Sequence, residues 1–131
     1  MTDISNIRVK PLTNPKVKVI WILGLVAFAI HGVFDPIISY LAISVFDVAT
    51  EANPLMAPHL QGSIGDLLLI HVPLVVLTLG GLAMLTWLFS IGTSSQKQQL
   101  FQISIGAWTL IILWGLVVVA NNLLVLIQGS S

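Results

Sequence analysis

The residue of greatest chemical interest in this sequence is Asp35, an acidic side chain inside a long apolar stretch. An ionised carboxylate in hydrocarbon costs about 3 kcal/mol or more to insert, so it needs a partner, a proton or water. His31 precedes it by one helical turn and Ser39 follows it by one turn. On a helix, these three side chains project from the same face. The spacing therefore predicts a polar helix face on which a carboxylate and an imidazole can hold or exchange protons.

Two later apolar stretches carry polar groups that can meet this face. If three helices cross a membrane, these groups fall in the same half of it as Asp35, and a buried cluster becomes geometrically possible. The candidate members of this intramembrane polar cluster are His31, Asp35, Ser39, His71, Thr78, Asn121 and Asn122.

The predicted polar cluster has three interpretations. Its members can join the helices by hydrogen bonds worth about 0.6 to 2 kcal/mol each. Alternatively, Asp35 with His31 or His71 forms a proton or cation relay. The third interpretation is a ligand or metal site, but two histidines and one carboxylate lack a spacing diagnostic of a metal. We therefore predict no metal site and no cofactor.

A second feature of interest is the segment Glu51-Ala52-Asn53-Pro54-Leu55. Asparagine before proline favours a turn, and proline opens a helix well at its first position. With Asp47, the residues Glu51 and Asn53 form a candidate outward loop that attracts a cation or docks a partner. The alternative is a simple turn at the membrane surface, because the two carboxylates lack the ordered spacing of a calcium loop.

Motifs of known catalytic chemistry are missing from the sequence. It has no glycine-rich phosphate loop, no nucleophile elbow, no zinc-protease helix and no cysteine. The five basic and five acidic residues cancel to a net charge of zero, so nothing favours a nucleic-acid partner. We therefore expect no enzymatic activity and no nucleic-acid binding.

The elements that must position these residues are long apolar helices. Of 131 residues, 56% are hydrophobic and 8% are charged, compared with about 25% charged in a soluble domain. Residues 19–46, 64–91 and 103–127 form apolar stretches longer than the ~20 residues that cross a bilayer. A polar, basic arm of residues 1–18 precedes them. The predicted fold is an all-α integral membrane bundle of three long transmembrane helices in a single domain, 1–131.

The first stretch contains Asp35-Pro36, where proline removes an amide donor and clashes with the preceding turn. It is either one helix kinked at Asp35-Pro36, or two, which gives four helical segments in all. Charge favours three crossings, since four basic residues of the arm and Lys97 then share one side of the membrane. The N-terminus is then cytoplasmic in a multi-pass protein of the cell membrane. Ser63 and Asp66 also predict a capping box at the start of the second stretch.

The arrangement of Asp35, Ser39 and the Glu51-Ala52-Asn53-Pro54-Leu55 turn before a second membrane helix resembles a family of small prokaryotic, often archaeal, helical membrane proteins of unknown function. The resemblance covers roughly residues 28–92. It implies a compact helical membrane domain in which the aspartate and the turn belong together, and it implies no activity.

These features lead to two hypotheses of function. The first is a small accessory or structural subunit that packs, beside lipid, against other membrane subunits or copies of itself through small and polar helix faces. The alternative is an oligomeric proton- or cation-conducting protein with an Asp/His relay.

Overall fold

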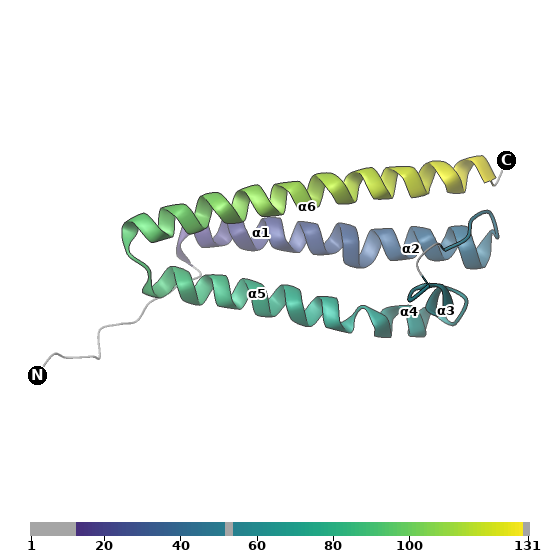
Figure 1. Cartoon of the computed structure of the whole chain (residues 1–131), viewed down its shortest axis with the longest axis horizontal. Helices are drawn as coiled ribbons and strands as arrows, with labels where there is room; N and C mark the ends of the chain where they lie inside the picture. The colour runs from purple at the N-terminus through teal and green to yellow at the C-terminus, as the bar shows by residue number, and fades with distance from the viewer. Residues whose placement is uncertain (1–12, 52–53, 130–131) are drawn as a thin grey trace, which may run out of the picture.

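The computed structural model describes residues 13–51 and 54–129, in which three long helices lie side by side (Figure 1). The first, Pro15–Val45, is a continuous run of α1 (Pro15–Ala29), η3 (Ile30–Phe34), α2 (Asp35–Tyr40) and η4 (Leu41–Val45). The second comprises α4 (Ile64–Ile70) and α5 (Val72–Ile91), and the third is α6 (Ser94–Gly129). A short helix, α3 (Ala57–Leu60), lies in the first connector. The predicted all-α bundle of three membrane-length helices is confirmed.

Pro36 is accommodated within the first helix. Just before it, η3 widens into a π-helical turn, in which the Asp35 amide donates to the Ile30 carbonyl instead of to the carbonyl four residues back. Such a turn relieves the clash of the proline ring with the preceding turn and lets the helix continue. The predicted stretch 19–46 therefore forms, up to Val45, part of one long, bent helix, and two separate helices meeting at Asp35 are not formed.

The second helix begins as its sequence predicts. The Ser63 hydroxyl accepts from the Asp66 amide, and the Asp66 carboxylate accepts from the Ser63 amide at 2.9 Å, which completes the capping box. The helix is interrupted at His71, between α4 and α5, because Pro73 cannot donate to the carbonyl one turn back.

The third helix is longer than predicted. The apolar stretch 103–127 is its later part, and α6 begins at Ser94, so Gly92 and Thr93 alone separate it from α5. Thr93 and Gln96 explain the early start. The Thr93 amide donates to the Gln96 side chain at 2.8 Å, while the Gln96 amide donates to the Thr93 hydroxyl at 3.4 Å. This is a capping box, and it lies in the polar segment that precedes the predicted apolar stretch.

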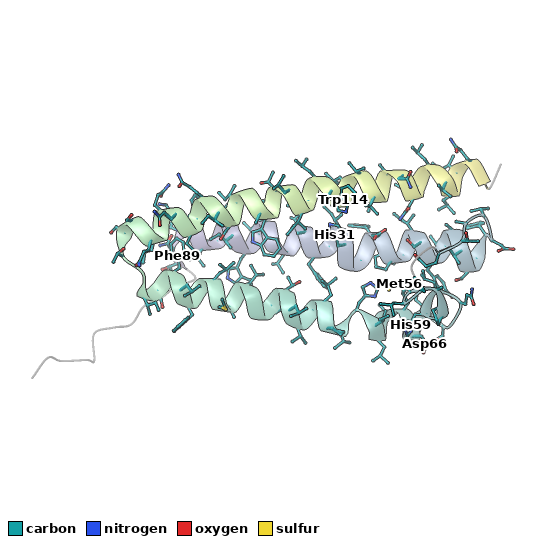
Figure 2. The ribbon with its side chains drawn as sticks, viewed as in Figure 1. His31, Met56, His59, Asp66, Phe89 and Trp114 are labelled. Carbon is teal, nitrogen blue, oxygen red and sulfur yellow. The ribbon has the colours of Figure 1, made fainter. Side chains whose placement is uncertain are left out.

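The packed core lies toward the end of the bundle where α1 begins. Val17 and Ile20 of α1 contact Leu82 and Phe89 of α5, and all four are at most 3% exposed. Most apolar side chains of α5 and α6 instead point outward (Figure 2). In the most apolar windows of the second and third helices, only 11% and 6% of residues are buried. Such apolar outer surfaces suit contact with a bilayer, where the surrounding lipid is itself apolar.

Candidate functional site

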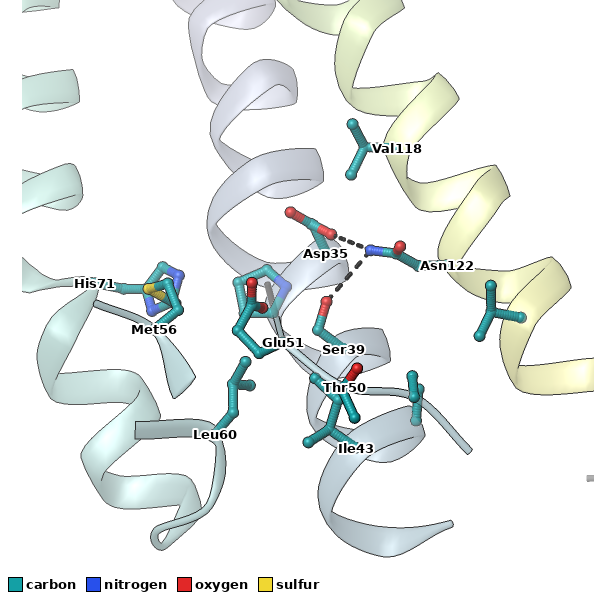
Figure 3. Close-up of a pocket in the computed structure, with 14 residues that line it drawn as sticks. Asp35, Ser39, Ile43, Thr50, Glu51, Met56, Leu60, His71, Val118 and Asn122 are labelled. Carbon is teal, nitrogen blue, oxygen red and sulfur yellow. Dashed lines mark hydrogen bonds between the residues drawn. The ribbon is translucent and has the colours of Figure 1, made fainter. Parts of the chain in front are cut away.

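Part of the predicted polar cluster, Asp35, Ser39 and Asn122, comes together in one interhelical tie between α2 and α6. The side-chain amide of Asn122 donates to the Asp35 carboxylate at 2.7 Å and lies 3.3 Å from the Ser39 hydroxyl (Figure 3). All three side chains are partly buried. Asp35 and Ser39 share a face of α2, as their four-residue spacing predicts. The tie therefore joins parts of the chain that are 87 and 83 positions apart.

Gly115 is the residue that brings α6 close enough for this tie. It is buried, and a β-carbon there would lie 2.5 Å from His31 Nε2 and 2.6 Å from Ile30 Cγ2. Any other residue type would force these side chains of η3, or α6 itself, to shift. Because Asn122 follows Gly115 by about two helical turns on the same helix, the close contact at Gly115 also sets the approach of Asn122 to Asp35.

Beside the tie lies a pocket of about 410 Å³, here called the Asp35 pocket. Asp35 and Ser39 line it from α2, and Asn122 lines it from α6. Glu51 and Met56 line it from the connector (Figure 3). Asp35 of the first helix and Glu51 of the connector therefore line the same pocket.

His71 also lines the Asp35 pocket, from the junction of α4 and α5. Its Nδ1 lies 2.7 Å from the Leu67 carbonyl oxygen, so this nitrogen carries a hydrogen and donates. In the neutral imidazole, Nε2 is then the acceptor. The structure thus gives the pocket two carboxylates and one imidazole.

His31 and Thr78 line a different pocket, of about 600 Å³, between α1, α5 and α6. His31 Nε2 lies 2.9 Å from the carbonyl oxygen of Ile111, and Trp108 and Trp114 form part of the apolar lining. The structure therefore does not bring His31 and Asp35 together, although they are four positions apart. The wide η3 turn lies between them and changes the angle at which their side chains leave the helix.

The remaining predicted residues lie apart from the tie. Asn121 is exposed, whereas its neighbour Asn122 faces α2. Asp47 is exposed and has a φ of 52°, a left-handed conformation that ends the first helix. Of the predicted outward loop, Glu51 lines the Asp35 pocket, and Asn53 lies outside the described residues.

Beyond Glu51, the contribution of the connector to the site was not predicted. Thr50, Met56 and Leu60 all line the Asp35 pocket, and the Ser44 hydroxyl donates to the Leu60 carbonyl, which holds the connector against the first helix. Hydropathy carries no signal for such contacts, because they depend on how a loop folds back. Between residues 13 and 51 and between 54 and 129, no group of three or more His, Asp or Glu side chains is placed to hold a metal ion.

The fold and the site define a class of protein, a small helical membrane protein with three membrane-length helices and a polar pocket toward an end of the bundle. No family model, curated protein or solved structure matches the chain. The resemblance of residues 28–92 to small prokaryotic membrane proteins therefore stays a prediction.

Proposed function

We propose that this protein is a small structural subunit that packs against other membrane helices, from partner subunits or from further copies of itself. The observation that carries the proposal is the glycine pair Gly80-Gly81, in the middle of α5. Both residues are exposed, and a β-carbon at either position would meet nothing within 4 Å. Glycine in a helix interior costs about 1 kcal/mol relative to alanine. Close approach of another helix offsets that cost, and the described residues of this chain provide no such neighbour.

The outer faces of the bundle support the same proposal. On α6, Leu113 and Val117 are 55% and 62% exposed, so the third helix presents large apolar side chains away from the bundle. Lipid can cover these faces, but contact with lipid does not offset the cost of two adjacent glycines inside a helix. The glycine pair and the outer face of α6 thus give two surfaces for helix contacts.

Charge supports an orientation with the N-terminus in the cytoplasm. The described lysines, Lys16, Lys18 and Lys97, lie toward the end where α1 and α6 begin. Lysine accumulates on the cytoplasmic side of membranes. On this proposal, Glu51 and the Asp35 pocket lie toward the outer surface.

A substitution at the glycine pair tests the subunit proposal. The variant Gly81→Leu fills the open space on α5, and Ala83→Leu, at another exposed position of α5, is the matched control. Native mass spectrometry after extraction in a mild detergent should give an oligomer or a complex for the wild type and for Ala83→Leu, and a larger monomer fraction for Gly81→Leu. A wild-type protein that is monomeric and carries no partner contradicts the proposal.

The alternative, a proton or cation relay, has less support. Of the two candidate histidines, His71 lines the same pocket as Asp35, whereas His31 lines a separate pocket whose wall is mainly apolar and aromatic. The structure thus leaves Asp35 and His71 as one possible pair and separates His31 from both. A relay through one chain would need polar groups that connect the two pockets. Flux assays on reconstituted protein separate the two hypotheses, since the subunit proposal predicts no pH-dependent ion flux from either the wild type or Asp35→Asn.

A further inference from the structure

The Asp35 pocket is large enough to hold a small molecule. Its volume of about 410 Å³ falls in the range of small-molecule sites, roughly 300 to 1,000 Å³. Asp35 lies ten positions before the end of the first helix at Val45, which corresponds to about 15 Å of helix. The pocket therefore reaches from the connector to a carboxylate well inside the membrane-length helix.

The Asp35 carboxylate uses one of its two oxygens in the tie to Asn122. Its Oδ1 accepts from the Asn122 amide, and Figure 3 shows the other oxygen pointing away from Asn122. Within the described part of the chain, that second oxygen, Oδ2, accepts no hydrogen bond. The Asn122 amide is neutral, so it orients the carboxylate without balancing its charge.

The charge of the pocket favours a cation. Asp35 and Glu51 both line it, and none of the described lysines does. Attraction between opposite charges is stronger in a low-dielectric site than in water, and a carboxylate at this depth is costly without a counter-charge or a proton.

The size of the pocket and its lining residues favour one class of cation over others. The volume exceeds what one metal ion fills, and the described residues contain no metal-binding group of three side chains. Apolar side chains, among them Ile43, Leu60 and Val118, make up part of the wall. We infer that the Asp35 pocket binds a small organic ammonium ion, whose N–H groups donate to Asp35 Oδ2 and whose apolar part contacts these side chains.

Protection of a single cysteine tests this inference. The chain has no cysteine, so Thr50→Cys places one reactive thiol on an exposed residue that lines the pocket. The full-length protein in detergent is labelled with a methanethiosulfonate reagent in the presence of methyl-, butyl- or cyclohexylammonium. A probe at about 10 mM with a Kd of about 1 mM should slow labelling about tenfold. Ser95→Cys, an exposed position at the other end of the bundle, is the control and should be labelled at an unchanged rate.

Two comparisons distinguish a charged site from apolar partitioning. The matched neutral probes, butanol and cyclohexanol, should give no protection. Adding Asp35→Asn to Thr50→Cys should abolish protection by the amines, and Glu51→Gln should weaken it. Equal protection by alcohol and amine, protection that survives Asp35→Asn in a variant with wild-type helicity, or no protection by any of the three amines overturns the inference. None of these results bears on the oligomeric state, which tests the proposed function separately.

Discussion

Asn122 donates its side-chain amide to the carboxylate of Asp35 across 2.7 Å, and this contact fixes α6 against α2. The neighbouring residue Asn121 is exposed and makes no such contact with α2. The two adjacent asparagines thus provide a matched pair, of which only Asn122 hydrogen-bonds to α2 among the described residues.

The first prediction concerns this pair. Asn122→Ala removes a donor shared by Asp35 and Ser39 and should lower the free energy of unfolding by about 0.6 kcal/mol and at most by about 1.7 kcal/mol, the average and the maximum measured for interhelical hydrogen bonds in a membrane protein. Asn121→Ala should change it by less than about 0.5 kcal/mol. Unfolding by sodium dodecyl sulfate in mixed micelles, followed by circular dichroism, measures both. Equal losses for the two variants would show that the tie does not stabilise the bundle.

The second prediction concerns the close contact at Gly115. Gly115→Ala places a methyl group 2.5 Å from His31 Nε2 and 2.6 Å from Ile30 Cγ2, so these side chains must shift or the helices must separate. Overpacking of this kind costs about 1 to 3 kcal/mol. Gly106→Ala, on the same helix, meets nothing within 4 Å and should be neutral or stabilising by up to about 1 kcal/mol. The same denaturation assay compares them, and a stabilised Gly115→Ala variant would contradict the close approach of α6 to η3.

The third prediction concerns the contact between the first two helices. The indole of Trp21 donates to the Thr86 hydroxyl at 2.8 Å, and this hydroxyl donates to the Leu82 carbonyl. Thr86→Val keeps the shape of the side chain but leaves the indole without its acceptor, at an expected cost of about 0.5 to 1.5 kcal/mol. Thr109→Val, at an exposed position of α6, is the control and should have no measurable effect. If Thr86→Val and Thr109→Val have the same free energy of unfolding, the hydrogen bond from the Trp21 indole contributes nothing to stability.

The bounds of the helices were predictable where local signals mark them. The apolar stretch 64–91 agrees with Ile64–Ile91, because Ser63 and Asp66 form a capping box at its start. The start of α6 was missed, since hydropathy reports the part of a helix that suits lipid and does not report a polar extension beyond it. The pattern of Thr93 followed by Gln96 is the signal that could have located it.

The candidate site was predictable where its residues follow the regular spacing of an α-helix. Spacing along an α-helix places Asp35 and Ser39 on one face, and they do meet Asn122 together. The same rule places His31 on that face, but the π-helical turn between His31 and Asp35 breaks the α-helical register. The pocket wall formed by Thr50 and Met56 depends on a folded connector, for which a periodic pattern gives no information.

The last prediction concerns how the bundle lies in the membrane. Ser63, before α4, and Ser95, in the first turn of α6, are exposed at opposite ends of the second helix. If this helix spans the bilayer with the N-terminus inside, an impermeant maleimide added to intact cells should label Ser63→Cys and leave Ser95→Cys unlabelled until the membrane is opened. Because the wild-type chain has no cysteine, it serves as the blank. Labelling of both positions from outside would mean that the second helix does not cross the membrane. Labelling of Ser95→Cys alone would reverse the orientation and place the Asp35 pocket toward the cytoplasm, so that its ammonium ligand would have to come from inside the cell.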